Sequence, residues 1–370
     1  MRRRLPYIIC KQLSCRFGRL RRWIGTERRT IVRQETLRRL ISLGLLVILL
    51  LIFGLTSDRF FTANNIYNML RESSLVGILA IGVTLVIITG GNDLSCGALM
   101  GLNCMLIAHM MHYTSLPLGV IMLITLGVAI LGGMLNGFSV AILRIPDFIA
   151  TLSTKFIFIG LMYVFAIHDE YGGLTTVSIK HDVIKWLGGK FREGPLDGLY
   201  YCTIAFVLLA IIVQFILKNT KTGTNLYAIG ANRNSAEVTG ISYVKTKFVA
   251  FIITGICSFV ACLFFLGKNR SAEPGGGVGY EFEAISATVI GGCAFSGGRG
   301  DIIGTVIGVL FMRVLENGIL KFGFPTETQQ LLSGVVIVVM LIFDAFYNEF
   351  MTERTRRSGA KQREMAVSTK

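Results

Sequence analysis

A pair of glycines and three polar residues interrupt an apolar stretch in the first third of the chain. Gly90 and Gly91 are followed by Asn92, Asp93 and Ser95, and apolar runs lie on both sides. A glycine pair breaks the helical hydrogen-bond ladder, and such backbone persists at membrane depth only inside protein or beside water. The carboxylate and its neighbours therefore have two readings: contact with a transported solute, or capping of the next helix. The two readings are compatible, and both stay open.

The same pattern recurs 207 residues further along the chain. Gly297 and Gly298 again follow a small hydroxyl residue and precede an aspartate, Asp301. Each segment then enters a helix with a Gly-x-x-x-Gly pair, at 97–101 and at 304–308, which predicts close helix packing. The pattern predicts an internal repeat, as in transporters whose two halves each contribute a glycine-broken helix to the pathway. Coincidence in a glycine-rich chain is the alternative.

Few other polar side chains lie within the apolar runs. Asn103 and Asn136 join the candidates for the solute pathway. Lys155, near the start of its run, is expected to extend its ammonium toward the membrane surface. Arg313 and Glu316 are three residues apart on one helix, which predicts an ion pair within it.

The composition is that of a membrane protein. Apolar residues make up 52% of the chain, charged residues only 16%, and the mean hydropathy is +0.63, whereas soluble domains carry about 25% charged residues. We predict an all-α polytopic membrane protein with about ten transmembrane spans. The run 284–293 is too short to cross alone, since a span needs about 20 apolar residues. The apolar runs are 41–55, 73–89, 96–111, 118–140, 148–167, 200–217, 248–267, 284–293, 302–319 and 331–346.

The net charge of +15 is concentrated in three segments. Residues 1–39 hold thirteen Lys and Arg against two Glu, a net of +11. Residues 218–247 net +4 and residues 349–370 net +3, whereas 168–198 and 268–283 each net −1. Basic segments separated by apolar spans follow the positive-inside rule. The charge therefore predicts a lipid-bilayer protein with both termini and 218–247 in the cytoplasm, and argues against a nucleic-acid partner.

The chain divides into three parts on this basis: a basic cytoplasmic extension (1–39), a transmembrane domain (40–347) and a basic cytoplasmic tail (348–370). Within the domain, the loop 218–247 carries the signature of a short helix, with Asn232 or Asn234 as its cap and Gly240 at its end. Such a helix is a candidate docking element, and a plain solvated loop is the alternative.

Motifs for chemistry on this chain are absent from the sequence. It has no Gly-x-x-x-x-Gly-Lys-Ser/Thr loop for ATP, no His-Glu-x-x-His and no Gly-x-Ser-x-Gly. No Cys-x-x-Cys or His-x-x-x-His spacing occurs either. We therefore predict a non-enzymatic chain with no catalytic residues, no metal site and no cofactor of its own.

Four segments, in order, resemble the ribose/galactose-type ABC sugar permeases. The resemblance covers about residues 45–346. Four features depart from the family pattern: the long basic N-terminus, Asp147 between Pro146 and Phe148, the charge of Lys155, and Cys96 beside the serine. The segments are ITGGNDLSCGALMGL, IPDFIATLSTKFI, LYAIGANRNSAEVTGISYVKTK and FEAISATVIGGCAFSGGRGDIIGTVIGVL.

The resemblance implies the permease subunit of a binding-protein-dependent importer in the bacterial inner membrane, which translocates a monosaccharide or related polyol. It implies three protein partners: an ABC ATPase that binds the ATP, an extracytoplasmic sugar-binding protein, and a second permease copy or sister permease. Ala236, Glu237 and Gly240, with Asn232 as cap, are then expected at the ATPase contact. Asn92, Asp93 and Ser95 are expected near the pathway.

Two other functions remain open. An ABC permease for a branched-chain amino acid or nucleoside would share the architecture. An ion-coupled secondary transporter would need no ATPase and would use an intramembrane carboxylate such as Asp93 or Glu316 for coupling.

Overall fold

A computed structural model gives the fold. It describes most of the transmembrane domain, whereas the expected extension (1–39) and tail (348–370) lie outside the described residues. The span expected at 331–346 also lies largely outside them. The described residues are 40–57, 59–168, 173–323 and scattered positions of one further helix between 328 and 342.

Helices make up most of the described chain, and two short strands pair with each other. After a helix at Leu40–Thr56 the elements are α2 (Ala63–Ile88), α3 (Cys96–Tyr113), α4 (Leu118–Gly137) with a π-helical turn η1 (Phe138–Ile142), α5 (Asp147–Val164), β1 (Val177–Ser178), α6 (Asp182–Leu187), α7 (Tyr201–Asn219), α8 (Lys221–Ala231), α9 (Arg233–Val238), α10 (Tyr243–Asn269), β2 (Ser271–Ala272), α11 (Tyr280–Ile290) and α12 (Ile302–Lys321).

The all-α membrane class is confirmed, but the count of ten spans is not. Six helices of the described residues are long and apolar enough to cross a membrane: α2, α4 with η1, α5, α7, α10 and α12. The helix Leu40–Thr56 is shorter, and α11 has only 11 residues. α11 was expected to be too short to cross, and the structure bears this out.

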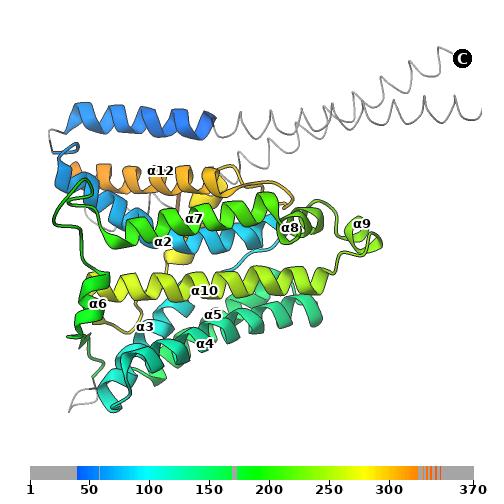
Figure 1. The fold of residues 1–370 in the computed structure, drawn as a ribbon. Helices are drawn as coiled ribbons and strands as arrows, with labels where there is room; N and C mark the ends of the chain where they lie inside the picture. Colours follow the sequence, from blue (N-terminus) through cyan, green and yellow to red (C-terminus); the bar gives the residue numbers. More distant parts are fainter. Residues whose placement is uncertain are drawn as a thin grey trace, which may run out of the picture.

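The helices are arranged around α2 (Figure 1). Most residues of the apolar part of α2 are buried within the protein, and α2 packs against α7, α10, α11 and α12. Only a minority of the residues in the apolar parts of α4 and α7 are buried, and these helices form the periphery. α3 is buried from Cys96 to Ala108, between α4, α5 and α10. The broken helices that follow the two glycine pairs therefore begin in the interior of the bundle.

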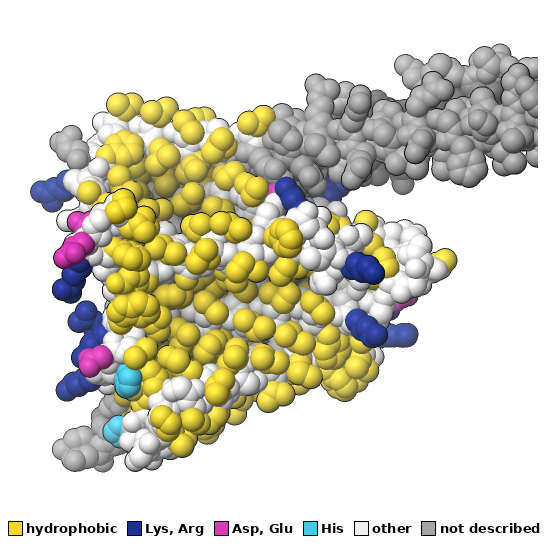
Figure 2. Space-filling model, in the orientation of Figure 1, with side chains coloured by type: hydrophobic (Ala, Val, Ile, Leu, Met, Phe, Trp, Pro, Cys, Tyr) yellow, Lys and Arg dark blue, Asp and Glu magenta, His cyan; other side chains and the backbone are white. Residues whose placement is uncertain are grey.

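The exposed surface has the pattern of a membrane-embedded protein. Figure 2 shows a broad apolar band over the helices, with Lys, Arg, Asp and Glu gathered toward its two ends. Peripheral helices supply exposed apolar side chains such as Leu123 on α4, Phe156 on α5 and Ile211 on α7. Such a continuous apolar surface is stable against lipid and not against water.

The two ends of the bundle carry different segments. At one end β1 pairs with β2 in an antiparallel register, Val177 opposite Ala272, and α6 lies beside them. At the other end lie α8 and α9, joined directly to the start of α10 (Figure 1). We call these the β1–β2 end and the α8–α9 end. The strands β1 and β2, from the two segments expected on one side of the membrane, thus meet at the end opposite to the basic segment.

Side-chain caps set several helix starts at the α8–α9 end. The hydroxyl of Thr220 accepts from Gly223 N at 3.3 Å and starts α8, and that of Ser242 accepts from Lys245 N at 3.3 Å and starts α10. Each cap satisfies a backbone N–H that has no partner within its own helix. The segment 218–247 is therefore mostly helical, where the sequence predicted one short helix.

Candidate functional site

The two glycine breaks of the predicted repeat contact each other. Gly90 has φ +73° and Gly297 has φ +86°, conformations that favour glycine. Gly297 packs directly on the backbone of Gly90, and a Cβ at Gly297 would overlap it. Residues 207 positions apart in the sequence thus form one junction, which we call the glycine junction.

The end of α8 completes the glycine junction. Gly230 packs on the carbonyl of Ile88 and the amide of Gly298, with no room for a Cβ. The amide of Gly298 donates to Ile88 O at 2.8 Å, and the hydroxyl of Tyr227 donates to Gly300 O at 2.7 Å. One helix of the α8–α9 end therefore contacts both broken segments directly.

Both Gly-x-x-x-Gly pairs serve close packing, as the sequence predicted. On α3, Gly97 and Gly101 lie against the backbone carbonyls of the turn 276–277. On α12, Gly304 and Gly308 lie against carbonyls of α11 and its end. Without side chains at these positions, each helix approaches its neighbour at backbone distance.

Three of the predicted pathway residues form one buried hydrogen-bonded row. Thr154 Oγ1 donates to Asn136 Oδ1 at 2.6 Å, and Asn136 Nδ2 donates to Ser95 Oγ at 2.7 Å. Ser95 Oγ donates in turn to Asp93 Oδ1 at 2.7 Å, which also accepts from Ser95 N at 2.8 Å. All four side chains are buried. The row ties the start of α3 to α4 and α5, and it is closed to solvent in this conformation.

The remaining candidates lie apart from this row. Asn103 is buried on α3, donates to Leu99 O at 2.9 Å, and its Oδ1 has no partner in the structure. Asn92 is half-buried, and its Oδ1 also lacks a partner. In the second break Asp301 caps α12 by accepting from Gly304 N at 3.0 Å. Asp93 accepts from Ser95 N, which precedes α3, and no side-chain hydrogen bond caps α3, so the capping reading for Asp93 and Ser95 is not confirmed.

Two buried ion pairs flank the first break, and the sequence analysis missed both. Lys155 Nζ lies 2.5 Å from Glu281 Oε1, and Lys247 Nζ lies 2.5 Å from Asp147 Oδ2. The expectation that Lys155 extends to the membrane surface is therefore wrong, because a carboxylate of α11 neutralises it inside the protein. Two of the departures from the family pattern, Asp147 and Lys155, each have a buried partner of opposite charge.

The ion pair predicted within α12 is confirmed and extended. Arg313 Nη1 lies 2.7 Å from Glu316 Oε2, and the other guanidinium nitrogen Nη2 binds Glu283 on α11. The missed partners, Glu281 and Glu283, lie just before the apolar run 284–293. The signal available for finding them was the presence of acidic residues beside one apolar run and of basic residues inside others. Within the described residues, no group of three His, Cys, Asp or Glu side chains could hold a metal ion.

At the α8–α9 end, the predicted short helix is present as α9. Asn232 caps it by accepting from Ser235 N at 3.0 Å, and Gly240, with φ +88°, follows its end. Ala236 faces inward and is buried, whereas Val238 is 89% exposed at the tip. Val238 is thus an apolar side chain available to a partner, which the sequence did not single out, and Glu237 beside it is also exposed.

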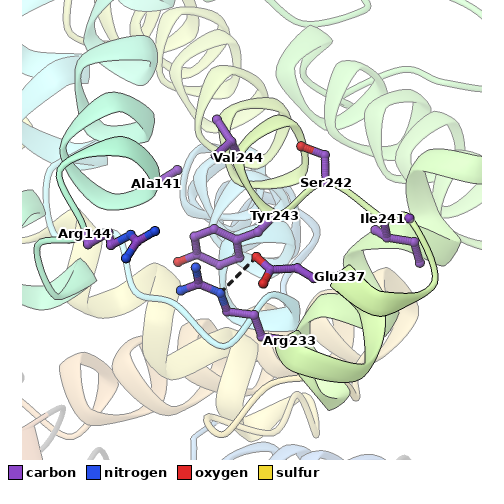
Figure 3. Close-up of a pocket in the computed structure, with 9 residues that line it drawn as sticks. Ala141, Arg144, Arg233, Glu237, Ile241, Ser242, Tyr243 and Val244 are labelled. Carbon is purple, nitrogen blue, oxygen red and sulfur yellow. Dashed lines mark hydrogen bonds and ion pairs between the residues drawn. The ribbon is translucent and has the colours of Figure 1, made fainter.

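A pocket of about 340 Å³ opens beside α9 (Figure 3). Arg233 lies between Glu237, 3.2 Å from its Nε, and Tyr243, whose ring centre is 3.8 Å from the guanidinium carbon. Arg144, from the turn between η1 and α5, reaches the same pocket and is exposed. The pocket therefore joins α9 to the α4–α5 turn through charged and aromatic groups.

Comparison with known proteins identifies the family. The family described as "Branched-chain amino acid transport system / permease component" matches residues 65–341. The chain is 34% identical to the ribose import permease protein of Bacillus subtilis (strain 168), over 87% of this chain and 97% of that protein. It is 32% identical to the ribose import permease protein of Escherichia coli (strain K12), over 82% and 92%. It is 30% identical to the galactose/methyl galactoside import permease protein of Haemophilus influenzae, over 81% and 92%. The matched residues include the two broken helices, α3 and α12, together with α8 and α9. The chain therefore belongs to this family of transport-system permease components.

Proposed function

We propose that the chain is the membrane-spanning subunit of a binding-protein-dependent ABC importer that carries a monosaccharide or related polyol into a bacterial cell. An ATPase on a partner chain binds ATP and drives the cycle. This chain itself binds no nucleotide and no cofactor. Its pathway is completed by a second permease copy or a sister permease.

The observation that carries this proposal is the contact of α8 with both glycine breaks. Gly230 packs on Ile88, which ends α2, and on Gly298, which precedes α12. A push on the exposed α9 is transmitted through α8 to two interior helices at once, because packed backbones shift together and do not deform continuously. This arrangement suits a subunit that receives ATP-driven movement from outside itself.

The solute class is inferred from relatives. Relatives of this chain are named for ribose import and for galactose/methyl galactoside import, and the match covers more than nine-tenths of their length. The family description names branched-chain amino acids, so that class stays the alternative solute.

Charge supports the orientation. The α8–α9 end carries the internal segment 218–247 with a net charge of +4, while the described residues 173–198 at the β1–β2 end hold four Lys and Arg against three Asp and Glu. The positive-inside rule therefore assigns the α8–α9 end to the cytoplasm and the ATPase. The β1–β2 end faces the binding protein outside the inner membrane.

The ion-coupled alternative has less support. It requires a carboxylate that exchanges an ion during transport, but Asp93 is held by two bonds from Ser95 and Glu316 by Arg313. Both carboxylates already have structural roles in the described protein.

Two measurements test the proposal. The tagged chain, extracted in mild detergent, should retain an ABC-type ATPase at near-stoichiometric yield, detected by mass spectrometry. Monosaccharide uptake should then fall on ATP depletion and persist with a protonophore. Two outcomes would favour the ion-coupled transporter: no ATPase is recovered with the chain even after cross-linking, and the protonophore alone abolishes uptake.

A further inference from the structure

The segment between β2 and α11 re-enters the membrane from the β1–β2 end. Lys155 lies eight residues from the start of α5 and nine from its end, so it marks the middle of that span. Glu281 binds Lys155 at 2.5 Å and therefore lies at the same depth. Residues 273–279 thus carry the chain from β2 at one membrane surface to the centre.

This re-entrant segment is irregular and partly open. Gly275, Gly277 and Gly279 have φ of +89°, +90° and +104°. One side of the turn packs on α3, but Val278 is 42% exposed and Phe282 47% exposed. Lipid cannot satisfy irregular backbone, so such a segment occurs at this depth only inside protein or beside water.

Phe282 covers the buried ion pair. Lys155 Nζ lies 4.9 Å from the centre of the Phe282 ring, while Lys155 and Glu281 are 8% and 0% exposed. An exposed aromatic ring in front of a buried ion pair suits a neutral polyhydroxylated ring, because the C–H face of a sugar packs on an aromatic ring.

We propose that residues 273–282 line the solute pathway at the middle of the membrane, with Phe282 as the surface on which the sugar ring stacks and the Lys155–Glu281 pair behind it. The sugar class rests on the proposed function. The row of Asp93, Ser95 and Asn136 lies inside the bundle and positions α3.

Accessibility of residue 282 to water tests this directly. In a parent with Cys10 and Cys15 replaced by serine, Phe282→Cys is compared with Ile211→Cys in membrane vesicles. Ile211 is 61% exposed and lies ten residues from the start of α7 and eight from its end, so it has matched depth. The six described cysteines are buried. We expect a charged, membrane-impermeant thiol reagent to modify residue 282 and not residue 211.

Equal reactivity at the two positions, or no reaction at residue 282, would overturn the proposal. Labelling needs no ATPase, so a failure here leaves the importer assignment intact if the ATPase still co-purifies. If Phe282→Cys does not accumulate, Phe282→Ala and Phe282→Trp supply the second measurement. We expect Ala to raise the KM for the best-transported monosaccharide about tenfold and Trp to preserve it. An unchanged KM in the Ala variant contradicts the stacking role.

Discussion

At the scale of single residues, buried polar groups stabilise the fold through the hydrogen bonds that they complete. The hydroxyl of Ser95 both donates to Asp93 and accepts from Asn136, and the amide of Asn136 also accepts from Thr154. Removing a central member leaves donors and acceptors unsatisfied on both sides, which costs more than the bond itself contributes. Asn136 and Ser95 are the two central members of this row.

Asn136→Leu should therefore destabilise the protein more than Asn103→Leu. Both asparagines are buried, but Asn103 makes only one bond, to a backbone carbonyl of its own helix. We expect the Asn136 variant to lose about 1–3 kcal/mol, seen as a lower Tm of the detergent-solubilised protein. An equal decrease in Tm for the two variants would contradict the network role of Asn136.

The Lys155–Glu281 pair makes a second prediction at this scale. Lys155→Met leaves Glu281 buried and charged without its partner, which costs about 3–5 kcal/mol for such pairs. The double variant Lys155→Met/Glu281→Gln removes both charges and should recover most of the Tm. A double-mutant cycle gives the coupling free energy between Lys155 and Glu281. If the double variant is as unstable as Lys155→Met alone, the unpaired charge of Glu281 is not the cause of the lower Tm.

At the scale of elements, α9 projects its apolar tip away from the protein. Val238 is 89% exposed on a six-residue capped helix. A partner that covers this side chain removes it from water and so stabilises the complex. Apolar side chains at the centre of an interface contribute most of its binding free energy. The neighbouring pocket, with Arg144 and Arg233, adds charged contacts at the rim of that interface.

Val238→Asp should reduce the yield of co-purified ATPase by about tenfold or more. Val183→Asp is the matched control, because Val183 is 47% exposed on α6, a six-residue helix at the β1–β2 end. Glu237→Lys and a bulky Gly240→Trp should also weaken the complex. If ATPase docking and uptake survive all three changes near α9, the docking assignment is wrong.

The glycine junction predicts that a substitution there impairs transport without impairing ATPase docking. Gly230→Ala forces α8 away from Ile88 and Gly298, whose backbone atoms occupy the site of the new methyl group. ATPase co-purification should persist, while uptake falls about tenfold or more. Gly127→Ala on α4 is the control, since nothing lies within 4 Å of its added Cβ. Normal uptake by the Gly230 variant would show that the junction does not transmit movement.

The elements themselves were largely predictable from the sequence. The run expected at 302–319 is α12, Ile302–Lys321, and the run at 96–111 is α3, Cys96–Tyr113. α2 begins ten residues before its expected run at 73–89. The sequence did not reveal these first turns because polar residues interrupt their apolar pattern: Asn64, Asn65, Asn68, Arg71 and Glu72. Hydropathy finds where a chain meets lipid, and it is weak where polar residues continue a helix beyond the apolar core.

The candidate site was predictable only in part. Asp93, Ser95 and Asn136 were found from their polarity within apolar surroundings, and the structure brings them together. Lys155 and Glu281 were not linked, since they are 126 residues apart and no motif joins them. Which buried charges meet depends on how helices pack, and that information is not local in the sequence.

At the scale of the whole molecule, the uneven distribution of charge implies one orientation in the membrane. The basic α8–α9 end and the β1–β2 end, which carries charges of both signs, are separated by the apolar band (Figure 2). If cationic segments are held on the cytoplasmic side, the ATPase of the proposed importer reaches the α8–α9 end. The proposed binding protein and ATPase then act on opposite ends, and the helices between them must carry the coupling.

Single cysteines at the two ends test this orientation. Asn234 on α9 and Glu193 in the loop after α6 are both exposed. In the parent with Cys10→Ser and Cys15→Ser, an impermeant thiol reagent should label Glu193→Cys in intact spheroplasts. Asn234→Cys should react only in inverted vesicles, because the membrane separates it from the outer solution. The reverse pattern would place the α8–α9 end outside, where no ATP-driven subunit could dock. Labelling of both positions from one side would contradict an odd number of crossings between 193 and 234, where α7 is the one described span.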